Sequence, residues 1–206
     1  MEQSVINNAT PWTLPPFDEE TITETKKLIA ENGENLVDSF YKSLEFGTGG
    51  LRGIMGVGTN KINKYTIGLA TQGLANYLKK AGKAPLSVAI ALDCRNNSDY
   101  FAQVAADVLS ANGIQVYVYE SLRATPQLSY TIRQLNCSAG IVITASHNPK
   151  EYNGYNVYWN DGGQLVPPHD KNVIDEVNKI KSVSDVKFEP NVELVNLLGH
   201  EMDEKY

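Results

Sequence analysis

The stretch Ile141–Gly154, IVITASHNPKEYNG, changes character at Ala145, where an apolar run gives way to a polar loop. The run before this point is short, β-branched and uncharged, which is typical of a buried strand. Ser146, His147 and Asn148 follow, so a hydroxyl, an imidazole and an amide lie together where the strand ends. Ligands of open α/β sheets bind at the carboxyl ends of strands, which makes Ser146 a candidate nucleophile.

A turn that caps the next element is the alternative interpretation of these residues. Serine and asparagine are frequent in such turns because their side chains bond the nearby backbone, and Pro149 fixes the backbone that follows. The G-x-S-x-G spacing of an α/β-hydrolase nucleophile is missing around Ser146. On the pattern alone, a turn and a nucleophile explain this loop equally well.

Strands and helices alternate along most of the chain. Strands are predicted over 86–92, 114–119, 140–144 and 155–159, and helices over 66–81, 99–111, 125–135 and 171–183. Short polar loops connect them. This alternation predicts an α/β fold, a three-layer α/β/α domain with a small mixed, mostly parallel sheet.

The chain divides into three parts by composition. Residues 1–45 are interpreted as an N-terminal arm, which contains three prolines and lies on the surface, followed by helices. Residues 46–183 hold the alternating strands and helices together with the central loop. Residues 184–206 are polar and mixed, are interrupted by Pro190, and are interpreted as a linker.

The overall composition excludes several classes of protein. The chain has 206 residues, of which 42% are hydrophobic and 20% charged, as is ordinary for a soluble domain. A formal net charge of −6 argues against a nucleic-acid-binding face, and no apolar run approaches the length of a membrane span. The N-terminus lacks the pattern of a secretory signal, and Cys94 and Cys137 show no metal spacing. We therefore expect a cytoplasmic protein.

A second segment with functional character runs from Phe46 to Gly58 and is dense in glycine. Glycine lets the backbone turn tightly and approach a ligand closely. The only cation in this segment is Arg52, whose planar guanidinium suits the oxygens of a phosphate group. A surface arginine in a flexible loop is the alternative, and the pattern alone favours that alternative.

The hexapeptide Thr144–Pro149, TASHNP, resembles the phosphoserine loop of the α-D-phosphohexomutases, the phosphoglucomutase/phosphomannomutase family. Its continuation, Lys150–Tyr155, also fits. The block Glu45–Gly53, EFGTGGLRG, is similar to the N-terminal active-site segment of the same family, and it precedes the hexapeptide by about a hundred residues, in the family's order. The resemblance spans nearly all of this chain but only the first of the family's four domains.

The resemblance implies a phosphoglucomutase or phosphomannomutase, an isomerase of carbohydrate metabolism. Phosphoryl transfer between C1 and C6 of a hexose phosphate would pass through a phosphorylated Ser146 and a hexose 1,6-bisphosphate. It also implies Mg²⁺ bound through the phosphate of Ser146, glucose 1,6-bisphosphate as the activating intermediate, and hexose phosphates as substrates, without nucleic acid or membrane. Three further domains, with the other metal ligands, would follow the linker 184–206, so this fragment alone would be inactive.

The same resemblance implies roles for the residues around Ser146. Arg52 would be catalytic and would bind phosphate, and Asn148 and Lys150 would be phosphate-binding residues. The alternatives are that Asn148 shapes the loop and that Lys150 is a solvated surface lysine. His147 would relay a proton, or would only order the loop.

One position departs from the family pattern. Asn156 stands where the family usually has a lysine that is proposed as an acid/base or phosphate contact. Asn156 supports the interpretation as a non-catalytic sugar-phosphate-binding homologue. A phosphopentomutase-type member of the family also stays open, because the resemblance implies that sugar choice lies in the later domains. Asp93 and Arg95, at the end of another predicted strand, either support the serine loop or form an ordinary loop pair.

Overall fold

A computed structural model of the chain describes residues 2–47, 49–82 and 84–206, so Met1, Thr48 and Lys83 lie outside the described residues. Its helices are α1 (Glu2–Ala9), α2 (Glu19–Glu31), α3 (Glu34–Phe40), α4 (Lys64–Ala81), α5 (Ser98–Ala111), α6 (Thr125–Gln134), α7 (His169–Asn178) and α8 (His200–Lys205). Its strands are β1 (Gly50–Ile54), β2 (Ser87–Leu92), β3 (Gln115–Tyr119), β4 (Ala139–Ile143), β5 (Tyr152–Trp159) and β6 (Val195–Leu198).

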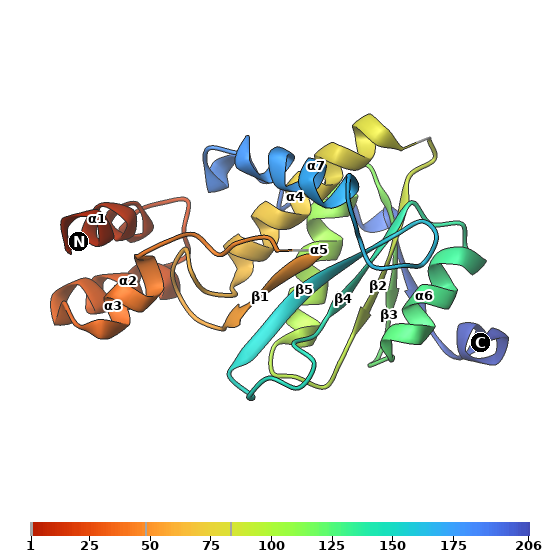
Figure 1. Ribbon diagram of the computed structural model, residues 1–206, viewed down its shortest axis with the longest axis horizontal. Helices are drawn as coiled ribbons and strands as arrows, with labels where there is room; N and C mark the ends of the chain where they lie inside the picture. The colour runs from red at the N-terminus through yellow and green to blue at the C-terminus, as the bar shows by residue number, and fades with distance from the viewer. Residues whose placement is uncertain (1, 48, 83) are drawn as a thin grey trace.

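The six strands form one mixed sheet in the order β1-β5-β4-β2-β3-β6. Strands β4, β2, β3 and β6 pair in parallel, whereas β5 pairs antiparallel with both β4 and β1. The prediction of an α/β domain with a mixed, mostly parallel sheet is therefore confirmed. The loop that joins β4 to its antiparallel neighbour β5 lies at the carboxyl end of β4 (Figure 1).

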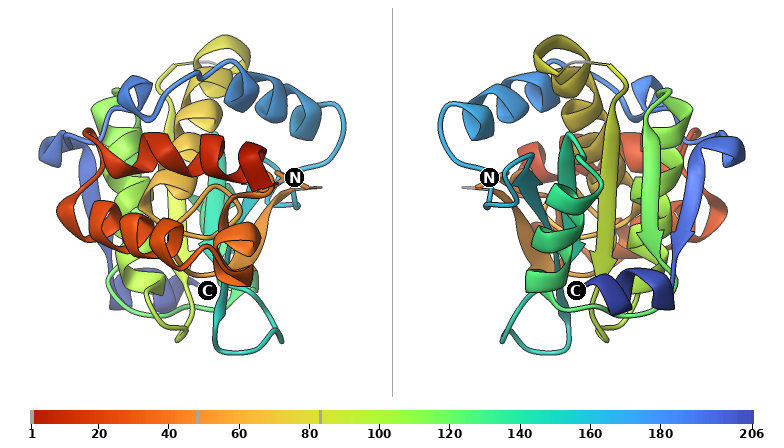
Figure 2. Two further views of the ribbon diagram at one scale, coloured as in Figure 1. Left: turned by 90° about the vertical axis from the view of Figure 1, so that its left-hand side faces the viewer. Right: turned by 90° about the vertical axis from the view of Figure 1, so that its right-hand side faces the viewer.

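Helices cover both faces of this sheet, which makes three layers (Figures 1 and 2). On β2, Val88 and Ile90 join the core beneath α4 and α5, whereas Ala89 and Ala91 join the core beneath α6. This alternation is that of a strand buried on both faces. Gly140 on β4 allows α6 to pack closely, because a side chain there would collide with Ile132.

The N-terminal residues fold differently from the predicted arm. Helix α1 is followed by a 3-10 turn, Thr10–Thr13, and Trp12 in that turn is buried. Trp12 stacks on Phe17 with ring centroids 4.5 Å apart and meets Phe40 and Tyr65 edge-on. These rings provide apolar burial, so residues 2–13 form part of a packed helical layer beside β1.

The C-terminal residues also depart from prediction, because the segment interpreted as a linker contributes a strand to the sheet. Strand β6 pairs in parallel with β3, with Val116 opposite Val195. Helix α8 then packs Met202 into the core beneath α6. Backbone pairing and this burial hold the segment against the domain. Over the described parts of the chain, no helix combines the length and apolar character needed to cross a membrane.

Candidate active site at the serine loop

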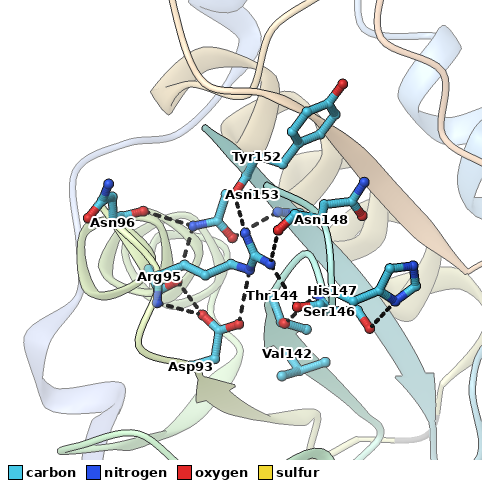
Figure 3. Close-up of polar contacts among 12 residues, drawn as sticks. Asp93, Arg95, Asn96, Val142, Thr144, Ser146, His147, Asn148, Tyr152 and Asn153 are labelled. Atoms are coloured by element: carbon cyan, nitrogen blue, oxygen red, sulfur yellow. Dashed lines mark hydrogen bonds and ion pairs between the residues drawn. The ribbon is translucent and has the colours of Figure 1, made fainter. Parts of the chain in front are cut away.

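The loop between β4 and β5, residues 144–151, carries the predicted nucleophile and is here named the serine loop. Ser146 is exposed, and its backbone has a positive φ of 55°. The hydroxyl of Thr144 accepts a hydrogen bond of 3.0 Å from the Ser146 amide, and the Ala145 carbonyl accepts one of 3.1 Å from the Asn148 amide. The loop is therefore a defined turn that presents the Ser146 hydroxyl to solvent at the end of a buried strand (Figure 3).

His147 lies beside the candidate nucleophile. Its Nδ1 atom is 3.3 Å from Oγ of Ser146, which is within hydrogen-bonding distance. In the tautomer with a bare Nδ1, the imidazole accepts the hydroxyl proton. This geometry allows His147 to take a proton from Ser146 or to return one.

Arg52 reaches the serine loop from the other end of the sequence. Strand β1 pairs with β5 so that Arg52 lies opposite Gly154, and Nη1 of Arg52 donates to Oδ1 of Asn148 over 3.2 Å. Glycine is required at position 154, since a Cβ there would lie 2.6 Å from the Thr144 carbonyl oxygen and 2.8 Å from that of Leu51. The backbones at Gly154, Thr144 and Leu51 therefore lie close together, and this brings Arg52 to the serine loop.

Lys150 and Asn156 are placed differently from this group. The Lys150 side chain is exposed and forms no hydrogen bond or ion pair within the described parts of the chain. Asn156 on β5 donates from Nδ2 to the Thr144 carbonyl over 3.0 Å and to the Val142 carbonyl over 3.4 Å. The amide of Asn156 is therefore attached to the base of the serine loop.

Arg95, which follows β2, makes the largest set of contacts with the serine loop. Its Nη2 atom donates to the carbonyls of Ser146 (2.7 Å) and Asn148 (2.6 Å). Its Nη1 atom donates to those of Pro149 (2.9 Å) and Tyr152 (3.1 Å). Its side chain is only 11% exposed, and its Nε atom lies 3.5 Å from Oδ2 of Asp93.

Buried Asn153 also links the serine loop to the loop after β2. Its Nδ2 atom donates to the Asn96 carbonyl and to Oγ of Ser98, both over 3.0 Å, and its Oδ1 atom accepts from the Gly154 amide. Asp93 in turn accepts a hydrogen bond of 2.9 Å from Ser98. The loop after β2 and the serine loop thus form one hydrogen-bonded unit (Figure 3).

The residues predicted for the site therefore fall into two groups. Ser146, His147, Asn148 and Arg52 lie together, whereas Lys150 forms no hydrogen bond or ion pair with them in the structure as described. On β5, burial raises the pKa of the Tyr155 phenol far above its usual value. Of the two interpretations of Asp93 and Arg95, the contacts of Arg95 agree with support of the serine loop. The contacts of Asn153 were not predicted.

The donors around Ser146 do not by themselves form a metal centre. Across the described residues, no group of three or more His, Cys, Asp or Glu side chains is arranged to hold a metal ion. The side chains next to Ser146 are an imidazole, an amide and a guanidinium, which suit an anion better than Mg²⁺. A phosphate on Ser146 would be the one ligand from this group.

A family model described as phosphoglucomutase/phosphomannomutase, alpha/beta/alpha domain I, matches residues 43–184. The chain belongs to this family. The match includes both Arg52 and the serine loop. The observed domain, a sheet with helices on both faces, agrees with the description as an alpha/beta/alpha domain.

Relatives within the phosphoglucomutase/phosphomannomutase family carry two different names. A phosphoglucomutase of Staphylococcus haemolyticus is 41% identical over 175 residues, which cover 79% of this chain and 32% of that protein. A human phosphopentomutase is 40% identical over 168 residues, which cover 77% of this chain and 28% of that protein. The chain therefore spans about a third of the length of these relatives.

Solved structures of the phosphoglucomutase/phosphomannomutase family show the same fold. A Thermus thermophilus protein assigned as a phosphomannomutase superposes with a TM-score of 0.66 at 25% identity, covering 76% of this chain and 33% of that one. A Burkholderia thailandensis family protein gives a TM-score of 0.59 at 18% identity, over 78% of this chain and 34% of that one, and supports the fold alone.

Proposed function

We propose that Ser146 carries the phosphoryl group of a phosphomutase that acts on a sugar phosphate. The observation that supports this most directly is the exposed Ser146 hydroxyl with the His147 imidazole 3.3 Å away and the Arg52–Asn148 pair at the same loop. A nucleophile, a proton acceptor and a cation are the groups that transfer of a phosphoryl group requires. Membership of the phosphoglucomutase/phosphomannomutase family points to the same chemistry.

The proposed reaction forms and breaks one bond in each half. Oγ of Ser146 attacks the phosphorus of a sugar bisphosphate, the bond between that phosphorus and the sugar oxygen breaks, and the oxygen leaves with the bonding electrons. The hydroxyl proton of Ser146 passes to Nδ1 of His147 and then to the leaving sugar oxygen. The reverse half returns the phosphoryl group to the other hydroxyl of the sugar monophosphate, so an isomer is produced without net hydrolysis.

Arg52 is proposed to stabilise the phosphate. A phosphoserine carries roughly −1.5 to −2 charges at neutral pH and accepts hydrogen bonds through three oxygens. In the structure one guanidinium nitrogen of Arg52 is engaged by Asn148, an uncharged partner that leaves the positive charge uncompensated. Asn148 thereby orients Arg52 toward the serine loop, and the guanidinium is available to a phosphate there.

A magnesium ion and glucose 1,6-bisphosphate complete the proposal. When bound at the phosphate of Ser146, Mg²⁺ would supply charge neutralisation for the transferring group. Its remaining ligands must come from outside the serine loop, because the described side chains around that loop offer no carboxylate cluster. Dependence of Ser146 phosphorylation on both compounds is therefore part of the proposal.

A hexose phosphate and a pentose phosphate are both candidate substrates. Relatives named phosphoglucomutase and phosphopentomutase are similar to this chain at 41% and 40% identity. We propose a glucose or mannose phosphate first, and a ribose or deoxyribose phosphate as the second candidate. A sugar-phosphate-binding protein without turnover is a third, supported by the neutral Asn156 beside the loop.

Isomerisation assays distinguish these three candidates. The protein at its natural length is assayed with glucose 1-phosphate, mannose 1-phosphate and ribose 1-phosphate, with Mg²⁺ and the matching bisphosphate, beside a Ser146→Ala control. We expect turnover of a hexose phosphate that the control lacks. Turnover of ribose 1-phosphate only would establish the pentose candidate, and binding of all three sugars without turnover would contradict the mutase.

A further inference from the structure

Arg95 has an unusual number of backbone partners for a single side chain. Its two terminal nitrogens donate four hydrogen bonds of 2.6 to 3.1 Å, all to carbonyl oxygens of residues 146–152. The side chain is 11% exposed, and Asp93 is its charged neighbour. All four hydrogen bonds of the guanidinium go to the backbone of residues 146–152, so its role is to hold that backbone and not to bind a ligand.

We propose that Arg95 is a positioning residue for phosphoryl transfer at Ser146, and this inference rests on the function proposed above. The bond from Nη2 to the Ser146 carbonyl fixes the peptide plane that follows the nucleophile. The bond to the Asn148 carbonyl fixes the residue that in turn holds Arg52. Arg95 therefore sets the direction of the Ser146 hydroxyl and the place of the phosphate-binding cation together.

The backbone of Ser146 explains why such a support is needed. A non-glycine residue with a φ of 55° is in the left-handed region, which costs free energy and persists only where the surroundings impose it. The side chains of the serine loop are largely exposed and give little apolar burial. The hydrogen bonds of Arg95 supply the constraint that packing does not.

Arginine fits this task and lysine does not. The four carbonyls take donors from both terminal nitrogens of one planar group, a geometry that a lysine ammonium with three donors on one atom cannot reproduce. The Asp93 carboxylate lies 3.5 Å from Nε on the other side of the guanidinium, and hydrogen bonds from the Arg95 amide and the Ser98 hydroxyl fix this carboxylate. The Arg95→Lys variant thus keeps the positive charge and removes the planar arrangement of hydrogen-bond donors.

The test compares wild-type protein at its natural length with Arg95→Lys and Arg95→Ala. Phosphorylation of Ser146 by glucose 1,6-bisphosphate and Mg²⁺ is followed by mass spectrometry as a function of bisphosphate concentration, and amide hydrogen exchange is measured over residues 144–151. Arg123→Lys is the matched control, because Arg123 follows the neighbouring strand β3 and pairs with Asp203 instead of the serine loop.

For both Arg95 variants we expect the phosphorylation rate at saturating bisphosphate to fall about 10- to 100-fold, as misplacement of a reacting group by an ångström can produce. The half-saturating concentration should change much less, and exchange should accelerate in residues 144–151 while the rest of the domain keeps its protection. Added methylguanidinium should partly restore the rate of Arg95→Ala. The control should retain the wild-type rate.

Two results would overturn the inference in different ways. If wild-type Ser146 becomes phosphorylated and Arg95→Lys matches it in both rate and exchange, Arg95 does not position the nucleophile. If the rates fall only in proportion to a general loss of folded protein, with no rescue by methylguanidinium, Arg95 is merely structural. Absence of phosphate on wild-type Ser146 would instead contradict the proposed function itself.

Discussion

Nη1 of Arg52 lies 3.2 Å from Oδ1 of Asn148, although 96 positions of sequence separate the two residues. The antiparallel pairing of β1 with β5 brings them together, with Arg52 opposite Gly154. The contact joins the glycine-rich segment to the serine loop, the two stretches in which the sequence suggested chemistry. It also places one positive charge at the loop that carries Ser146.

Replacement of Arg52 by alanine should weaken sugar-phosphate binding. Hydrogen bonds to charged groups contribute about 1.5–3 kcal/mol, so we expect the dissociation constant of glucose 1,6-bisphosphate to rise roughly 10- to 150-fold. Titration calorimetry measures the change. Arg133→Ala is the control, since Arg133 is an exposed arginine in the last turn of α6 that bonds Ser129. Equal affinities of the Arg52 variant and wild type would remove Arg52 from the site.

Replacement of Asn156 by lysine should raise the rate of phosphoryl transfer. The Asn156 amide cannot donate a proton to a leaving oxygen, whereas a positioned lysine can, and general acid–base catalysis contributes about 10²- to 10⁴-fold. The rate of sugar-phosphate isomerisation measures the change. Asn156→Met introduces an uncharged side chain of about the length of lysine, so it is the control for loss of the bonds to Thr144 and Val142. An unchanged rate in Asn156→Lys would assign proton transfer to another group, with His147 the nearest.

The two cysteines should differ sharply in reactivity toward thiol reagents. Cys94 is exposed, whereas Cys137 is 1% exposed and its burial raises its pKa to about 11. At pH 8 only about one thousandth of Cys137 would be thiolate, the reactive form. We expect one fast equivalent of a disulfide reagent per native chain and two after denaturation. Rapid modification of Cys137 in the native protein would contradict this packing.

The pair of Arg123 and Asp203 should stabilise the docked C-terminal helix above acidic pH. Both Asp203 oxygens accept from Arg123 over 2.7 Å, and these hydrogen bonds lower the pKa of the carboxyl. A lowered pKa in the folded state means that the stabilisation is present above the unfolded pKa of about 3.9 and is lost as the pH falls through the lower, folded value.

Asp203→Asn should therefore melt at a lower temperature than wild type at pH 7, and the difference should shrink as the pH falls below about 4. Differential scanning fluorimetry across this pH range provides the measurement. Glu201→Gln, an exposed substitution on the same helix, is the matched control and should leave the melting temperature unchanged. A melting-temperature difference as large at pH 3 as at pH 7 would show that Asp203 acts through something other than its charge.

Local signals in the sequence predicted most of the central domain because local forces decide those elements. The apolar runs before residues 93 and 144 became β2 and β4, and Asp18 caps α2 by accepting from the Thr21 amide, as its type suggests. Helix α6 begins at Thr125, as predicted, with Pro126 in its first turn and Ala124 as its N-cap.

Elements that depend on distant partners were not predicted. Strand β6 is four residues long and half exposed, and only its pairing with β3 makes it a strand. Helix α1 is polar and buries just Val5 and Ala9 among its described residues, against residues of α3 and the turn at Trp12. In both cases tertiary contacts outweigh weak local preference.

The residues of the candidate site also divide into those that the local sequence identifies and those that depend on distant partners. Ser146, His147 and Asn148 are adjacent in sequence, and Arg52 was found through the motif that contains it. Support of the serine loop was one of two interpretations of Arg95, and the sequence could not decide between them. The partners of Arg95 are backbone carbonyls, which every residue has and which therefore leave no trace in the sequence. Only the fold shows that the ends of β2 and β4 lie side by side.

The most direct test of the proposed function is the phosphorylation state of Ser146. The protein at its natural length is incubated with glucose 1,6-bisphosphate and Mg²⁺ and analysed by intact mass and phosphopeptide mapping, beside Ser146→Ala. The proposed function predicts one phosphate per chain, mapped to Ser146 and absent from the variant. An unmodified Ser146, or a phosphate that the variant retains, would contradict it.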